Sequence, residues 1–165
     1  MDLCRGVDEE LVESLWVRIK GQAHLDDTVV VVYYRPPDQR EEVNEACYKQ
    51  LKAASQSQAL VLMGDFNHPD ISWEDHTARN KQSRRSLQSI DDNFLMQVVE
   101  EPTRKGALLD LALTNKEGLV EDVKVGGSLG CSDHKMIELR ILCGSSRAIS
   151  RIKTLDFRRA NFDLF

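Results

Sequence analysis

The run Val29–Tyr34 constrains the fold of this chain more than any other segment. Its six consecutive apolar or aromatic residues include four valines, a pattern typical of a strand buried on both faces. It is the longest apolar run in the chain, and it is much shorter than the roughly 20 residues of a membrane-spanning helix. Pro36 and Pro37 end it, because proline donates no hydrogen bond to a sheet. The sequence therefore predicts a sheet protein with no membrane partner.

Two helices are expected between the strands. In the first, Val43, Cys47, Leu51 and Ala54 form one apolar stripe, and Asp38 with Glu41 resembles a capping box. In the second, helical spacing joins the positions Ser83, Leu87, Ile90 and Phe94.

Further strands are predicted on both sides of these helices. In the first, Leu15, Val17 and Ile19 alternate as the apolar side of a half-buried strand. The others are expected over residues 59–63, 97–99, 108–114, 119–125 and 135–142. Strands outnumber helices, so the predicted class is mixed α/β with a layered sheet.

Charge divides the chain near residue 144. The net charge is -5, but residues 1–143 carry 17 basic and 25 acidic side chains, whereas residues 144–165 carry five basic and two acidic ones. We expect one domain over residues 1–143, followed by a basic linker or tail over residues 144–165. The four cysteines are scattered without a CxxC pair, which predicts reduced thiols, no disulfide partner and an intracellular location, nuclear or cytoplasmic.

Three polar positions conflict with their apolar surroundings. Asp65 and Asn67 directly follow an apolar strand, and side chains two residues apart at the end of a strand point the same way. The alternative is an ordinary polar turn. Asp110 lies inside an apolar strand, where a carboxylate needs a partner or a metal unless it faces solvent. Asp133 and His134 form an acid–imidazole pair in a loop; a lone histidine is more often structural.

Together these residues suit phosphodiester chemistry. Carboxylate oxygens are preferred ligands of Mg²⁺, and a phosphate substrate completes its coordination. A carboxylate can activate water, an amide can hold a phosphate oxygen, and a histidine oriented by a carboxylate can stabilise developing charge. A serine-hydrolase interpretation is weaker, because the chain has no GxSxG motif.

The motifs resemble those of a known superfamily. The segments 60–67 (LVLMGDFN), 109–111 (LDL) and 132–134 (SDH) are similar to the C-terminal motifs of the endonuclease/exonuclease/phosphatase superfamily. The resemblance is strongest to endonuclease domains of non-long-terminal-repeat retrotransposons, particularly the chicken-repeat clade, and it includes segments 32–37 and 155–159. It implies a DNase I-like β-sandwich flanked by helices, with Mg²⁺ or Mn²⁺ as cofactor and DNA as partner.

The resemblance also implies roles for single residues. Asp65 would activate the attacking water or protonate the leaving oxygen, and Asn67 would help to position it. Asp110 would orient His134 toward the scissile phosphate, and Asp133 would lie beside the metal. Tyr34 matches a tyrosine that hydrogen-bonds phosphate, although packing at the strand end is an alternative.

A basic group is a candidate DNA-contacting rim. Its members lie in two segments, and for any one of them a solvated surface position is the simpler interpretation. They are Arg79, Lys81, Arg84, Arg85, Arg104 and Lys105.

The same resemblance predicts an incomplete domain. The family's principal metal-binding glutamate and an early asparagine lie on strands of the N-terminal half, and this chain begins after them. We therefore expect weak Mg²⁺ binding and an exposed apolar sheet edge or face. The interpretations left open are a DNA-nicking endonuclease joined by its tail to a reverse transcriptase domain, a catalytically dead remnant that at most binds nucleic acid or protein, and a phosphatase or lipid phosphodiesterase.

Overall fold

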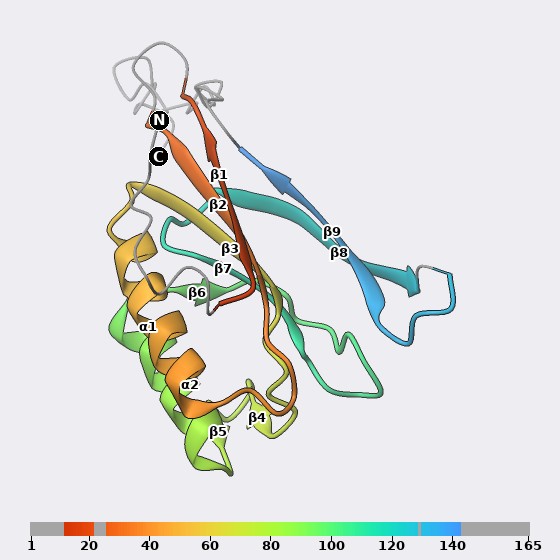
Figure 1. The fold of residues 1–165 in the computed structure, drawn as a ribbon. Coiled ribbons are helices and arrows are strands. Elements are labelled where there is room, and N and C mark those ends of the chain that lie inside the picture. Colours follow the sequence, from red (N-terminus) through yellow and green to blue (C-terminus); the bar gives the residue numbers. More distant parts are fainter. Residues whose placement is uncertain (1–11, 22–25, 129, 143–165) are drawn as a thin grey trace, which may run out of the picture.

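The computed structural model describes residues 12–21, 26–128 and 130–142 (Figure 1). The predicted tail, together with Cys4 and Cys143, lies outside these ranges. The chain forms, in order, β1 (Ser14–Ile19), β2 (Thr28–Tyr34), α1 (Glu41–Ser55), β3 (Ala59–Asp65), β4 (Ile71–Ser72), β5 (Thr77–Ala78), α2 (Lys81–Asp92), β6 (Met96–Gln97), β7 (Asp110–Thr114), β8 (Val120–Ser128) and β9 (Lys135–Ile141).

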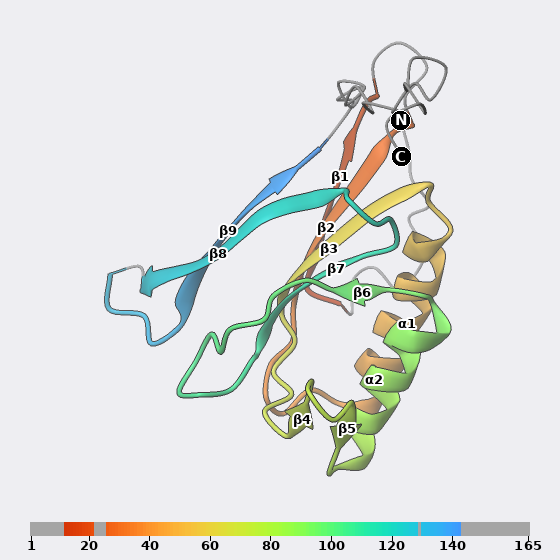
Figure 2. The same cartoon turned by 180° about the vertical axis from the view of Figure 1, so that it is seen from behind.

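A five-stranded sheet in the order β1-β2-β3-β7-β6 forms the centre of the molecule. β2 and β3 are parallel, with α1 as the crossover between them, and the other neighbours are antiparallel. The helices α1 and α2 lie on one side of this sheet and the β8–β9 hairpin lies on the other (Figures 1 and 2). The predicted mixed α/β class with a layered sheet is confirmed.

The two faces of the sheet pack into separate apolar clusters, because successive side chains of a strand point to opposite faces. The helix-side cluster includes Val31, Tyr33, Leu60, Leu62, Leu111 and Leu113, packed with Ala46, Leu51 and Ala54 of α1. The hairpin-side cluster is smaller: Ala59 and Val61 pack with Leu119, Val30, Met63, Val120 and Ile141. On this face of the sheet, the hairpin therefore covers β3 more fully than β1.

The β1–β2 part of the hairpin-side face is exposed. Leu15 is 63% exposed, Val17 45% and Val32 44%. We call the surface of Leu15, Val17, Ile19, Val32 and Tyr34 the open face. An exposed apolar sheet edge or face was expected, but two separate predictions about which side of these strands is buried are wrong. Segment 29–34 is not buried on both faces, and β1 packs through Trp16, because an alternating pattern fixes the period of a strand and not the side that is covered.

The ends of the helices differ from the prediction in two places. Asp38 lies in the turn in which Gln39 N donates to Pro36 O, so the capping box is not formed, and Arg40 precedes α1 without a side-chain cap. The second helix is capped by Asn80, whose Oδ1 accepts from Ser83 N at 2.7 Å. Phe94 is 86% exposed with φ 53°, beyond the end of α2, so it does not extend the apolar stripe.

Two expectations about composition can be compared with the described residues. Cys47 and Cys131 are free thiols there. No helix in the described part of the chain is long and apolar enough to cross a membrane.

A buried polar cluster joins the turn after β3 to the first turn of α2. Ser83, which is fully buried, donates its hydroxyl to Asp70 Oδ1 at 2.5 Å, so its oxygen accepts from Nδ1 of His68 at 3.0 Å. Burial, followed by the charge of Arg35, lowers the pKa of His68 to about 4. His68 is therefore neutral in the folded protein at pH 7.

Protonation of His68 is expected to destabilise the fold in acid. The unfolded chain binds a proton near pH 6.5 and the folded chain only near pH 4, so stability is lost as pH falls through this interval. The loss should reach roughly 3 kcal/mol at pH 4, since one pKa unit corresponds to about 1.4 kcal/mol. Urea unfolding at pH 7 and pH 4 should show a smaller pH dependence for His68→Asn than for the wild type. The exposed His76→Asn is the control, and equal pH dependence in all three proteins would contradict this assignment.

Candidate active site

Three neighbouring strands bring polar side chains to one end of the sheet. Tyr34 is the register partner of Asp65 across the parallel β2–β3 pair, and Asp65 is the partner of Asp110 across the antiparallel β3–β7 pair. Register partners share a face of the sheet, so all three lie on the hairpin side, at the end of the open face. Gly64 permits this geometry: its φ is +145°, and a Cβ there would lie 1.8 Å from the Tyr33 carbonyl oxygen.

His134 completes this group from the loop before β9. Its Nδ1 lies 2.9 Å from Asp110 Oδ2, and one ligand atom each from Asp65, Asp110 and His134 all lie within 4.8 Å of one another. Thr103 connects the two segments that meet here. Its Oγ1 accepts from the main-chain N–H groups of Leu109 and Asp110, each at 3.1 Å, and its carbonyl accepts from Lys135 N at 2.8 Å.

The two carboxylates affect one another. Burial raises the pKa of Asp65, and the negative charge of Asp110 raises it further. The main-chain N–H of Asn67, 3.0 Å from Asp65 Oδ1, and the nearby His134 act in the opposite direction. Asp65 is therefore better suited to carry a proton than an ordinary surface aspartate.

Asn67 lies in the left-handed region, with φ 49°. Its main chain is held by Asp65 and by Arg35, whose Nη1 donates to the Asn67 carbonyl at 3.2 Å. Within the described residues, its side-chain amide has no hydrogen-bond partner. The amide is thus available to a ligand at the site.

The two tyrosines at the end of β2 point to opposite faces. Tyr33 is 4% exposed, packs edge-on against Phe66, and its hydroxyl accepts from Gln39 Nε2 at 3.1 Å. Tyr34 is 44% exposed on the same side as Asp65. Packing therefore accounts for Tyr33, whereas Tyr34 remains accessible.

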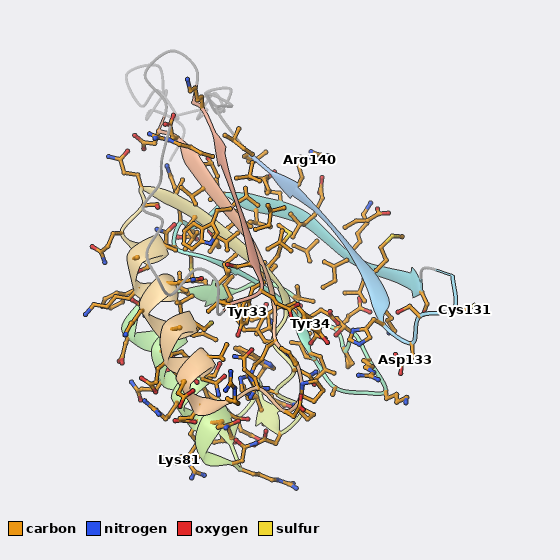
Figure 3. The ribbon with its side chains drawn as sticks, in the orientation of Figure 1. Tyr33, Tyr34, Lys81, Cys131, Asp133 and Arg140 are labelled. Atoms are coloured by element: carbon orange, nitrogen blue, oxygen red, sulfur yellow. The ribbon has the colours of Figure 1, made fainter. Side chains whose placement is uncertain are left out.

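Asp133 lies outside this group. Its Oδ2 is 2.9 Å from Arg104 Nε and 3.3 Å from Lys105 Nζ, and these two cations hold the pKa of Asp133 below its usual range. Figure 3 places Asp133 near the tip of the β8–β9 hairpin. Its metal-binding role stays a prediction, and binding a metal would require competition with both basic side chains.

The predicted basic rim separates into two groups (Figure 3). Arg104 and Lys105 are beside the hairpin, while the others are at the start of α2, where Lys81 is labelled. Arg85 is paired with Glu41 and Glu45. Arg79 and Lys81 are exposed, and no ion pair involves either of them in the described parts of the chain.

Sequence reasoning missed two residues that hold the site together, Arg35 and Thr103. Arg35 is 3% exposed and Thr103 is fully buried. A charged residue directly after an apolar strand was a usable signal for Arg35. Nothing local distinguishes Thr103 from an ordinary turn residue, because its partners Asp110 and Lys135 come from later segments.

The donor set suits a divalent cation that is bound in part by its substrate. Two half-buried carboxylates that repel each other are the ligands a hard cation prefers, whereas His134 Nδ1 is already engaged with Asp110. Mg²⁺ is usually held by one or two carboxylates, several waters and substrate phosphates. Asp65 and Asp110 could supply the protein ligands.

Comparison with known proteins places the chain in a family. The model of a family described as endonuclease-reverse transcriptase matches residues 28–138. The chain belongs to this family. No curated protein matches it.

Solved structures support the same fold. The endonuclease domain of TRAS1, a telomere-specific non-LTR retrotransposon, matches with a TM-score of 0.61 and 19% sequence identity. The match covers 80% of this chain and 63% of the TRAS1 chain. The expected DNase I-like fold is thus confirmed, and the chain spans somewhat under two-thirds of the length of that domain.

Proposed function

We propose that this chain carries the catalytic centre of a Mg²⁺-dependent endonuclease that nicks DNA. The observation that carries the proposal is the convergence of Asp65, Asp110 and His134 within 4.8 Å at one end of the sheet. The endonuclease-reverse transcriptase family and the retrotransposon origin of the TRAS1 domain favour DNA as the substrate.

Each residue has a distinct role in this proposal. Asp65 exchanges a proton with the attacking water or the leaving oxygen, for which its raised pKa is suited. Asp110 accepts from Nδ1 of His134, so Nε2 is the ring nitrogen left to face a phosphate oxygen, to which it donates when the imidazole is protonated. The side-chain amide of Asn67, in the turn after β3, and the hydroxyl of Tyr34, at the end of β2, contact the phosphate. A bound Mg²⁺, or Mn²⁺ in its place, supplies Lewis-acid stabilisation of the charge that develops on the phosphate.

A catalytically inactive remnant is the second candidate. It is favoured by the small donor set, which among the described residues is two carboxylates and one imidazole, and by the separation of Asp133, which is engaged with Arg104 and Lys105. The open face adds to this case, because exposed apolar surface next to a catalytic site is unfavourable in water.

Plasmid nicking tests the first candidate against the second. The wild type should convert supercoiled plasmid to nicked circle with Mg²⁺ and not with EDTA. His134→Ala should lower the rate at least about 100-fold, the usual contribution of a positioned acid–base group. His76→Ala is the matched control, because His76 is exposed and pairs with Asp91 away from the site.

Other outcomes separate the candidates. Equal nicking by the wild type and His134→Ala would contradict the assigned site. If neither the wild type nor His134→Ala nicks above the background with EDTA, the inactive remnant is favoured. If a longer polypeptide carrying the upstream part of the domain then nicks, the site is real and needs that part.

The basic residues predict how the chain binds DNA. Neutralising Arg79, Lys81, Arg84, Arg85, Arg104 and Lys105 together should weaken binding and reduce the salt dependence of the dissociation constant, by about 0.9 in log–log slope for each phosphate that the variant no longer neutralises. Arg85→Gln alone should change little, because Glu41 and Glu45 already neutralise this side chain. Fluorescence anisotropy over a salt series measures both. An unchanged slope in the sixfold variant would exclude a DNA-facing rim.

A further inference from the structure

We propose that Arg35 is a positioning residue that fixes the turn Asp65–Asn67 in the candidate active site, an inference that rests on the function proposed above. Arg35 follows Tyr34 at the end of β2, next to the end of β3. It touches neither Asp65 nor His134 through its side chain among the contacts of the described residues, so its influence passes through the main chain of the turn.

Arg35 holds the turn at both ends. Its main-chain N–H donates to the Asp65 carbonyl at 2.8 Å, and its Nη1 donates to the Asn67 carbonyl at 3.2 Å. Both Asp65 and Asn67 are thus hydrogen-bonded to the same residue, Asp65 to the main chain of Arg35 and Asn67 to its side chain.

The attachment at Asn67 determines the direction of its peptide groups. Asn67 has φ 49°, in the left-handed region that asparagine adopts more readily than most other non-glycine residues. In this conformation the Asn67 N–H reaches Asp65 Oδ1 at 3.0 Å while its carbonyl reaches Arg35. Releasing the carbonyl would allow the turn to relax, and the hydrogen bond that orients the Asp65 carboxylate would weaken.

The rest of the Arg35 side chain is anchored to both helices. Its Nε donates to Asn44 Oδ1 of α1 at 3.2 Å, and its Nη2 donates to Gln82 Oε1 of α2 at 2.9 Å. The guanidinium fork therefore transmits the position of the two helices to the turn. A lysine ammonium cannot reproduce this planar arrangement of donors.

Stability alone is a poor explanation for Arg35. The residue is 3% exposed, and in the described parts of the chain it has no carboxylate partner; its acceptors are amide and main-chain oxygens. A buried cation without an anion is costly, and a well-packed apolar residue often stabilises such a position more. What an apolar residue cannot supply is the simultaneous contact with the turn and both helices.

The test compares Arg35→Lys with Gln39→Leu. Gln39 belongs to the same buried network, because its Nε2 donates to Asn44 Oδ1 at 2.7 Å, but none of its hydrogen bonds reaches the turn. We expect hydrogen exchange of the main-chain N–H of Asn67, followed by NMR, to accelerate about tenfold in Arg35→Lys relative to Gln39→Leu. In the nicking assay kcat should fall about 100-fold in Arg35→Lys with little change in KM, as for a misplaced catalytic group.

The two measurements can fail separately. Asn67 exchange that is no faster in Arg35→Lys than in Gln39→Leu would overturn the inference, whether or not the chain nicks DNA. An absence of nicking in the wild type would contradict the proposed function and leave the exchange measurement to decide the role of Arg35. If Arg35→Lys does not fold, Gln82→Leu releases the Nη2 contact while retaining the guanidinium, and the same comparison with Gln39→Leu applies.

Discussion

Two like charges face each other across neighbouring strands, and the functional end of this molecule is built around that pair. Asp65 and Asp110 are direct register partners, an arrangement that is unfavourable unless other groups compensate for it. Compensation comes from His134, bonded to Asp110, and from the Asn67 N–H, bonded to Asp65. The burial and mutual repulsion that make the pair costly also raise the pKa of Asp65, which is the property that proton transfer to or from a phosphodiester requires.

The two faces of the central sheet differ: the larger apolar cluster is on the helix side, and the candidate active site is on the hairpin side. On the helix side a continuous apolar cluster joins the sheet to both helices and fixes the ends of β2, β3 and β7 relative to one another. On the hairpin side the packing is limited, and the site borders the open face.

Much of this arrangement could be predicted from the sequence, because the signals are local. Apolar runs identified β2 and β3, and Asp110 stood out as a charge among leucines. Failures came where the answer depends on partners distant in sequence. The alternation in β1 did not reveal that Trp16, rather than Leu15, packs inward, and the ion pair of Asp133 depends on a loop about 30 residues earlier in the chain. The metal role of Asp133 and the roles of the basic residues stay predictions.

Asp65 and Asp110 are the candidate protein ligands of a divalent cation, and the Mg²⁺ dependence of the proposed nicking requires such a site. Titration with Mn²⁺, a paramagnetic substitute for Mg²⁺, tests this directly through the broadening of assigned amide signals. We predict that signals of the turn after β3, the start of β7 and the loop at His134 broaden first, and that Asp110→Asn removes this effect. Broadening that begins instead at the exposed acidic residues at the end of α2, or that persists unchanged in Asp110→Asn, would contradict the proposed centre.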